Sequence, residues 1–345
     1  MTRTVTVTAP VRIADLGGWT DTWFAGHGAV CHLAVAPGVE VRLSARPADD
    51  GPELVVEAHD FEERYVLPDA GAFERRHGLL AAAIGAARRA PDHAYHVHLT
   101  SGVPPGASTG TSAAVVVAIL AAFDEMAGEP VSRADLARRA HAVEVQSLGQ
   151  ESGVQDQIAA AYGGVNFIEM PRYPDTIIEP LRLDAATREA LDEQLLLVYL
   201  GEAHDSSAVH REVIASIEAG GMHRRVLDGL RSLARQGRAA LLAGDLAAYG
   251  RTLAANCDQQ AALHPSLVSD VAARVIGAAR MHGAAGWKVN GAGGHGGSVT
   301  LLCGASPSAR ADLARQVEAE VPGARVLRVT LSPVGVKCAH RLRVE

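Results

Sequence analysis

The feature that most constrains this fold is a loop of small residues that leads directly into a helix with no polar face. The loop reads Ser-Gly-Val-Pro-Pro-Gly-Ala-Ser-Thr-Gly-Thr-Ser over residues 101–112, and an almost wholly apolar stretch continues to Met126. A helix that is apolar on all sides is stable only when it is buried, so other elements must cover it. Gly128 and Pro130 predict where this helix ends.

The same loop predicts an anion site. Amide groups at a helix N-terminus, aided by the helix dipole, bind phosphate. Hydroxyl groups at Ser108, Thr109, Thr111 and Ser112 can add contacts to phosphate or Mg²⁺. The loop is not a Walker A sequence, because no Gly-Lys-Ser/Thr ends it. The alternative is a plain turn that caps a core helix.

A second segment, residues 151–164, carries a candidate catalytic base. It reads Glu-Ser-Gly-Val-Gln-Asp-Gln-Ile-Ala-Ala-Ala-Tyr-Gly-Gly, and it places Asp156 near the start of a short helix. The helix dipole favours an ionised carboxylate there, and such a group can orient a hydroxyl nucleophile toward a phosphoryl group. An aspartate that only caps its helix is the alternative.

A third segment, residues 288–302, is rich in glycine and contains GxGxxG at Gly291, Gly293 and Gly296. A dinucleotide-binding loop of that form needs a strand before it and a helix after it. The residues that follow alternate like a strand, so this interpretation fails. What remains is a glycine loop that approaches a phosphate or another loop closely. His295 either donates to a phosphate or has no role.

Length, charge and composition limit the function classes. A chain of 345 residues predicts two domains. The net charge of −7 argues against nucleic-acid binding, which needs a basic face. No apolar run reaches membrane-spanning length, and the first residues lack the apolar core of a signal peptide, so we expect a cytoplasmic protein.

Cysteine and histidine spacing gives little sign of a metal site. The four cysteines have no CxxC spacing, so reduced, buried thiols are expected. His96 and His98 share one face of a predicted strand, and His204 and His210 are six residues apart, but no further ligand converges on either pair in sequence. A structural metal is therefore not expected. Lys288 is one of only two lysines and lies three residues before the first glycine of that loop, Gly291.

The remaining pattern predicts an α/β chain. On the helix predicted over 133–148, Glu144 falls on the apolar side with Leu136 and Ala140, where an unpaired charge would be costly. The proline-rich stretch 171–180 is interpreted as approaching a domain boundary. Strands are expected over 3–9, 29–35, 39–46, 53–67, 94–100, 165–169, 195–200, 298–303, 324–330 and 337–344, and further helices over 77–89, 206–218, 222–243, 245–262, 266–282 and 307–319.

Together these segments resemble the three motifs of the GHMP kinases, which include galactokinase, homoserine kinase and mevalonate kinase. Residues 9–22, Ala-Pro-Val-Arg-Ile-Ala-Asp-Leu-Gly-Gly-Trp-Thr-Asp-Thr, are similar to the first motif. Their Gly-Gly-Trp-Thr-Asp form resembles fucokinase and heptose 7-phosphate kinases, the sugar 1-kinase branch. Residues 105–114 resemble the second motif, and residues 291–297 resemble the third.

The resemblance implies a role for each matched position. Asp156 would be the catalytic base, and Arg12 would lie near the transferred phosphate. Mg²⁺ would bind Glu144 and either Thr111 or Ser112. The choice between these two hydroxyls stays open because Ser-Thr-Gly-Thr replaces the usual Gly-Leu-Gly-Ser. ATP would bind Pro105, Gly106, Ala107, Ser108, Thr109, Gly110, Thr111, Ser112, Gly291, Gly293 and Gly294, and the sugar would bind Trp19, Thr20, Asp21 and His204.

The resemblance also implies an α/β (α+β) two-domain fold with the active site in the cleft between the domains. A ribosomal-protein-S5-domain-2-like domain would span residues 1–185, and a ferredoxin-like domain would span residues 190–345. The implied reaction transfers phosphate from ATP to the anomeric hydroxyl of a sugar or sugar phosphate. The expected assembly is a monomer or homodimer with no nucleic-acid or membrane partner. Alternatives are a kinase for a non-sugar alcohol and a non-catalytic sugar-sensing homologue.

Overall fold

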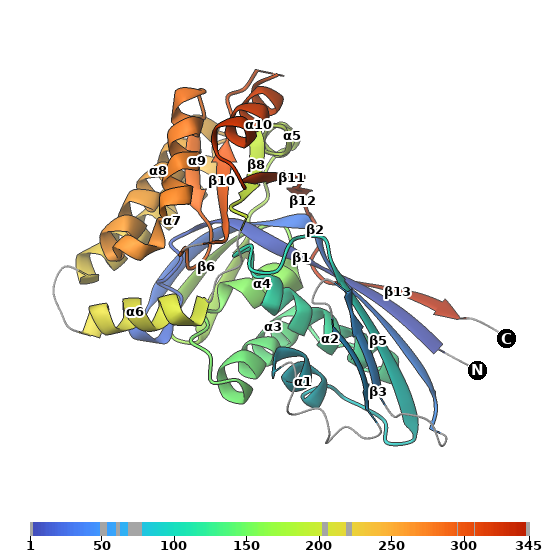
Figure 1. Ribbon diagram of the computed structural model, residues 1–345. Helices are drawn as coiled ribbons and strands as arrows, with labels where there is room; N and C mark the ends of the chain where they lie inside the picture. The colour runs from blue at the N-terminus through green and yellow to red at the C-terminus, as the bar shows by residue number, and fades with distance from the viewer. Residues whose placement is uncertain are drawn as a thin grey trace.

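The computed structural model describes residues 3–48, 54–59, 63–67, 78–201, 206–218, 223–294, 296–306 and 308–342. Its strands form two sheets, with helices packed against each (Figure 1). The larger sheet has the order β13-β1-β2-β5-β3-β4, and β6 and β12 also pair with β2 while β7 pairs with β6. Its strands are β1 (Arg3–Leu16), β2 (Gly28–Pro47), β3 (Leu54–Ala58), β4 (Glu63–Leu67), β5 (His93–Ser101), β6 (Val165–Arg172), β7 (Asp175–Pro180), β12 (Thr330–Leu331) and β13 (Lys337–Leu342).

One face of this sheet is covered by helices α1 (Gly78–Gly85), α2 (Thr111–Ala127), α3 (Arg133–Ala142) and α4 (Gln155–Tyr162). α2 and α4 lie against β1 and β2, whereas α1 and α3 pack against α2. Every residue of α2 from Ala113 to Asp124 is buried, which confirms the predicted all-apolar helix. Gly128 ends it in the left-handed conformation, with its amide bonded to the carbonyl groups of Asp124 and Glu125.

The other face of the large sheet is polar along β5. Val97 and Leu99 point into the core with α2, and Tyr95 contacts Phe123 of that helix at a ring-centroid distance of 5.1 Å. His96 and His98 alternate with these residues and are exposed or half-buried. This period-two pattern shows that the histidines lie on the face that points away from α2.

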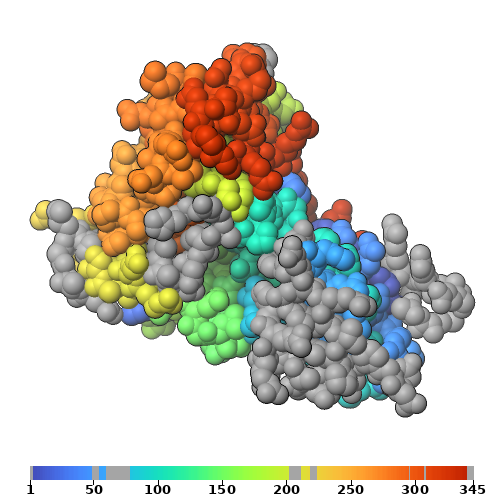
Figure 2. Space-filling model, in the orientation of Figure 1, coloured from blue at the N-terminus to red at the C-terminus, as the bar shows by residue number. Residues whose placement is uncertain are grey.

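The smaller sheet has the antiparallel order β11-β8-β10-β9. Its strands are β8 (Leu195–Tyr199), β9 (Gly286–Val289), β10 (Ser298–Leu302) and β11 (Arg325–Leu327), and the helices of this part are α5 (Ala185–Gln194), α6 (Ser206–Glu218), α7 (His223–Leu242), α8 (Leu246–Leu263), α9 (Asp270–Met281) and α10 (Ala309–Glu320). Figure 2 shows this orange and red part above the blue and green N-terminal part. No helix in the described ranges is long and apolar enough to cross a membrane.

Several elements connect the two parts. α7 packs against β1, β2 and β6, while its neighbour α8 packs against β9. After β11 the chain returns to the large sheet, where β12 pairs with β2 and β13 pairs antiparallel with β1. The α/β two-domain architecture is confirmed, and the predicted division at residues 185–190 stays a prediction.

Some elements differ from those predicted. The two strands expected over 29–35 and 39–46 form the single strand β2, because its pairing with β1 resumes after a bulge. The proline-rich stretch 171–180 forms a hairpin of β6 and β7 within the large sheet. The helix expected over 133–148 changes to a π-helical turn at Val143–Ser147. α5 and β9 lie where no element was predicted.

Candidate active site

The three motif-bearing segments converge on one cleft. The cleft brings together residues that are far apart in sequence. Four described residues that were predicted for the site do not line the cleft, namely Thr20, Pro105, Gly293 and Gly294. The predicted residues that line the cleft are Arg12, Trp19, Asp21, Gly106, Ala107, Ser108, Thr109, Gly110, Thr111, Ser112, Glu144, Asp156 and Gly291.

Arg12 of β1 holds Asp156 of α4 by two hydrogen bonds. Arg12 Nε donates to Oδ1 at 2.8 Å, and Nη2 donates to Oδ2 at 3.1 Å. Nη1 donates to the carbonyl oxygen of Ser108 in the loop before α2. Arg12 is buried, whereas the Asp156 side chain remains 26% exposed. The guanidinium fork thus fixes the orientation of a carboxylate that a ligand can still reach.

Asp21 binds the N-terminus of α4. Its Oδ2 accepts hydrogen bonds from the backbone amides of Val154 and Gln155 at 3.0 and 3.1 Å. Gly153 permits this approach, because a Cβ at that position would lie 2.3 Å from Asp21 Oδ2. Burial, and then the charge of Asp156, raise the pKa of Asp21 to about 6. Asp21 therefore positions the helix that carries Asp156, in addition to lining the cleft.

Glu144 lies in the π-helical turn after α3, a type of irregularity that is frequent at functional sites. Its Oε2 accepts hydrogen bonds from Ser152 Oγ at 2.6 Å and Gln157 Nε2 at 2.8 Å. Its Oε1 is buried and has no partner among the described residues. Burial outweighs these hydrogen bonds and raises the pKa of Glu144 to about 7. A buried carboxylate oxygen without a partner fits a hard cation such as Mg²⁺.

The loop before α2 passes close to Asp156. Gly106, Ser108 and Gly110 have φ angles of 74°, 57° and 71°. A Cβ on Gly110 would lie 3.0 Å from Asp156 Oδ2, so glycine allows both the left-handed backbone and the close contact. Thr111 begins α2, and its hydroxyl lies 3.1 Å from that of Thr109.

The glycine loop after β9 packs against protein backbone. A Cβ on Gly291 would lie 3.0 Å from the carbonyl oxygen of Ser108, and one on Gly293 would lie 2.1 Å from that of Leu267. Ser298 Oγ donates to the carbonyl oxygen of Ala107 at 2.6 Å. The predicted close approach to another loop is thus observed, whereas phosphate binding by this segment stays a prediction. His295 lies outside the described residues.

A buried ion pair joins β1 to β9, and its carboxylate, Asp15, also lines the cleft. Lys288 Nζ lies 3.3 Å from Asp15 Oδ1, and the amide of Gly291 lies 3.2 Å from both Asp15 oxygens. Burial alone would raise the pKa of Asp15, but the charges of Lys288 and Arg12 outweigh it and lower the pKa. The sequence marked Lys288 as unusual. Its partner, 273 positions away, could not be identified from sequence.

Of the residues predicted to bind the sugar, Trp19 and Asp21 line the cleft and Thr20 does not. Trp19 lines the cleft and packs with Phe24 and with Leu230 of α7. The Thr20 hydroxyl donates to the carbonyl oxygen of Gly17 at 2.7 Å, which stabilises the turn after β1. His204 lies outside the described residues.

Sequence reasoning missed several polar cleft residues just before Asp156. Gln155 lines the cleft, and its buried Oε1 has no partner in the described part of the chain. The missed residues lie in or next to the segment 151–164. The sequence of that segment does not show which side chains face a ligand. The missed residues of this stretch are Gln150, Glu151, Ser152, Gly153 and Gln155.

Comparisons with known proteins agree with this geometry. The model for the GHMP kinases N terminal domain matches residues 76–164, which contain the loop before α2, Glu144 and Asp156. A D-glycero-alpha-D-manno-heptose 7-phosphate kinase from Campylobacter jejuni is 28% identical over 208 residues, which cover 59% of each chain. An L-fucokinase/L-fucose-1-P guanylyltransferase from Bacteroides fragilis is 23% identical over 96% of this chain and 38% of its own length. The chain thus spans about half the length of these relatives.

The fold also matches a solved structure along its whole length. A D-glycero-D-manno-heptose 1-phosphate kinase from Bacteroides thetaiotaomicron superposes with a TM-score of 0.74 at 21% identity, with 100% of both chains covered. This likeness supports the fold. The chain therefore contains a GHMP kinases N terminal domain over residues 76–164, within a fold that it shares with this solved structure.

Proposed function

We propose that this protein is an ATP-dependent kinase that converts a sugar or sugar phosphate to a sugar 1-phosphate. The observation that carries the proposal is the setting of Asp156. Arg12 holds this partly exposed carboxylate through two hydrogen bonds, and Gly110 brings the loop before α2 against it. A carboxylate beside a phosphate site can orient a hydroxyl nucleophile toward the transferred phosphoryl group.

The loop of residues 105–112 would hold the ATP phosphates. It ends at the N-terminus of α2, where amide groups and the helix dipole favour an anion. Gly291, Gly293 and Gly294 would approach the nucleotide from the smaller sheet. Glu144 and the hydroxyl of Thr111 or Ser112 would bind Mg²⁺. The bound ion would neutralise charge on the phosphate oxygens.

Asp156 would act as the general base. It would accept the proton of the anomeric hydroxyl as that oxygen forms a bond to the γ-phosphorus, while the bond to the β–γ bridging oxygen breaks and ADP leaves. An anomeric hydroxyl is more acidic than other sugar hydroxyls, which favours this assistance. Arg12 would stabilise negative charge on the transferred group.

The sugar would lie against Trp19, Asp21 and Gln155, and we propose that His204 also binds it. The supporting observations are that the first three line the cleft beside Asp156 and that the matched relatives are named as heptose-phosphate kinase and fucokinase. We also propose domains over residues 1–185 and 190–345, a cytoplasmic location, and a monomer or homodimer.

The test is an ADP-release assay with MgATP over free hexoses, free heptoses and their terminal phosphates, with mevalonate and homoserine added as non-sugar alcohols. We expect release that depends on a sugar or sugar phosphate and that is slower by about 10²–10⁴ in Asp156→Asn. Turnover only with a non-sugar alcohol would contradict the substrate class. Sugar binding by calorimetry without any ADP release would instead support a non-catalytic sugar-sensing protein.

A further inference from the structure

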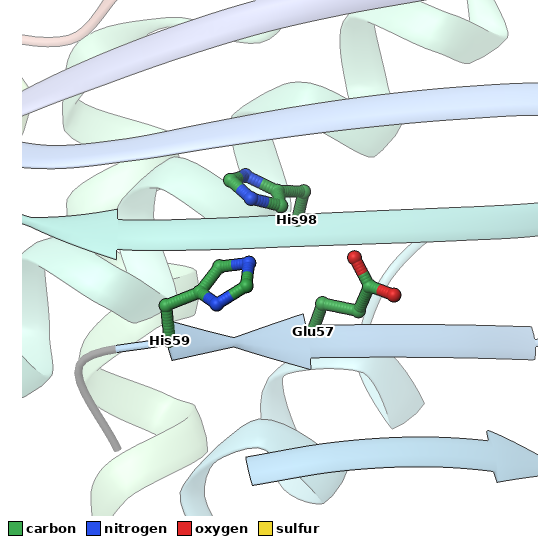
Figure 3. A group of neighbouring side chains, drawn as sticks. All are labelled: Glu57, His59 and His98. Atoms are coloured by element: carbon green, nitrogen blue, oxygen red, sulfur yellow. The ribbon is translucent and has the colours of Figure 1, made fainter. Parts of the chain in front are cut away.

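The polar face of the large sheet carries a second group of ligand-type side chains. Glu57 belongs to β3, His59 follows the end of that strand, and His98 belongs to β5. β3 and β5 pair in parallel, with Glu57 opposite His98. Figure 3 shows the three side chains on the same side of the two strands, with the two imidazole rings near one another. This group lies on the face that points away from α2.

The geometry of this group suits a metal ion. One ligand atom from each of Glu57, His59 and His98 can be chosen so that all three lie within 4.8 Å of one another. The two imidazole ring centroids are 4.8 Å apart. Donor atoms around one tetrahedral zinc ion are separated by roughly 3.3 Å, given metal–ligand distances of about 2.0–2.1 Å. Side-chain rotation can supply this small contraction, because His59 is exposed and the other two are half-buried.

We propose that Glu57, His59 and His98 form a binding site for a divalent transition metal ion of the zinc class. Two imidazole nitrogens and one carboxylate oxygen are a common donor set for such ions, whereas Mg²⁺ and Ca²⁺ prefer oxygen ligands alone. His96 supplies a fourth side chain beside the site, because its Nε2 lies 3.4 Å from Glu57 Oε2. A tetrahedral ion would therefore take either His96 or water as its fourth ligand.

The electrostatic surroundings are compatible with a cation. Arg42 is opposite His98 in the pairing of β2 with β5, so it adds a positive charge beside the site. Its guanidinium lies 3.7 Å from Glu40, which offsets part of that charge.

The sequence alone could not reveal this site. His96 and His98 had no further ligand nearby in sequence, and the fold supplies Glu57 and His59 from about forty residues upstream. An ion bound there would connect β3 to β5, so it would stabilise the pairing of these two strands. Because it would bind only to the folded arrangement, it should raise the unfolding temperature.

The experiment is calorimetric titration of the full chain, without a histidine tag and after chelator treatment, with ZnCl₂ in excess MgCl₂. The magnesium occupies oxygen-rich sites such as the one predicted at Glu144.

Variants His59→Ala, His98→Ala and Glu57→Gln remove one ligand each. His282→Ala is the matched control. His282 also lies beside a glutamate, with Nε2 2.6 Å from Glu320 Oε1, but it belongs to no described group of three metal ligands. Circular dichroism checks that each variant is folded, and the visible spectrum of added Co²⁺ reports its coordination.

We expect one equivalent of Zn²⁺ to bind the wild type and to raise its unfolding temperature. Each ligand substitution should weaken binding by more than about tenfold, since loss of an outer-shell partner alone costs 10–100-fold. His282→Ala should bind as the wild type does. Zinc affinity that is equal in the wild type and in the double variant His59→Ala/His98→Ala would overturn the proposal. Zinc binding lost in Glu144→Gln but kept in that double variant would also overturn it.

Discussion

Lys288 Nζ lies 3.3 Å from Asp15 Oδ1, and the two side chains are 0% and 1% exposed, so a fully buried ion pair joins β9 to β1. Asp15 also accepts from the amide of Gly291, which places this pair between the first motif and the glycine loop. The pair therefore couples the position of that loop to the strand that carries Arg12.

Loss of Lys288 should be strongly destabilising. Lys288→Met leaves the Asp15 carboxylate buried without its partner, a change that costs about 3–5 kcal/mol. Urea unfolding measures this loss. The double variant Asp15→Asn/Lys288→Met should recover part of it, because no charge is then stranded. Arg315→Ala breaks the exposed pair with Asp312 and should cost less than about 1 kcal/mol. Equal losses in Lys288→Met and Arg315→Ala would contradict a structural role for the buried pair.

Asp156→Asn should abolish most turnover while the protein remains folded. The change is nearly isosteric but removes the proposed base, and loss of general-base assistance costs about 10²–10⁴ in rate. The measurement is kcat with saturating MgATP and the accepted sugar, with ATP affinity determined by calorimetry as the control. A folded Asp156→Asn enzyme with a kcat close to that of the wild type would exclude Asp156 as the base.

Glu144 should make magnesium binding depend on pH. Its pKa is raised from 4.5 to about 7, so the folded protein keeps this proton over a range in which the unfolded chain has lost it. This contribution to stability is full below pH 4.5 and is lost as the pH rises through 7. Mg²⁺ needs the ionised carboxylate, so the increase in unfolding temperature caused by MgATP should be larger at pH 8 than at pH 6.

Glu144→Gln is the control for this pH dependence, because ATP itself titrates in the same range in both proteins. The variant should show a smaller increase in unfolding temperature with MgATP, and the part of the pH dependence due to Glu144 should be absent. The same increase as in the wild type at both pH values would mean that Glu144 is only a structural carboxylate.

Gly110→Ala should weaken ATP binding. The new Cβ would lie 3.0 Å from Asp156 Oδ2 on a backbone with φ of 71°, so the loop must move away from the carboxylate. We expect ATP affinity to fall by about tenfold, equivalent to 1.4 kcal/mol. Gly277→Ala in α9 is the matched control, since a Cβ there meets nothing within 4 Å and the φ is ordinary. Unchanged ATP affinity in folded Gly110→Ala would mean that this loop does not bind the phosphates.

Local sequence patterns predicted the parts of the fold that depend on neighbouring residues. The buried helix α2 follows from an unbroken apolar stretch, and the end of that helix follows from Gly128. Glu144 could be identified because a carboxylate on the apolar side of a helix is unusual, whereas the roles of Arg12 and Asp156 were predicted from the resemblance of their segments to the kinase motifs. The π-helical turn at Glu144 could not be distinguished in the sequence from the α-helix that precedes it.

Relationships between distant segments could not be predicted in the same way. Asp21 binding to the amides of Val154 and Gln155, and Asp15 pairing with Lys288, each join residues more than 130 positions apart. The same limit applies to the group of Glu57, His59 and His98, which only the strand pairing assembles. Such contacts depend on sheet order and domain docking, which residue spacing does not encode.

The most direct test of the proposed reaction is proton and phosphorus NMR of the product formed from MgATP and the accepted sugar. If Asp156 acts on the anomeric hydroxyl, the anomeric proton of the product will show coupling to phosphorus, and Asp156→Asn will form this product about 10²–10⁴ times more slowly. A product that carries the new phosphate on a primary hydroxyl would contradict the anomeric assignment. Absence of any phosphorylated product would contradict the kinase assignment itself.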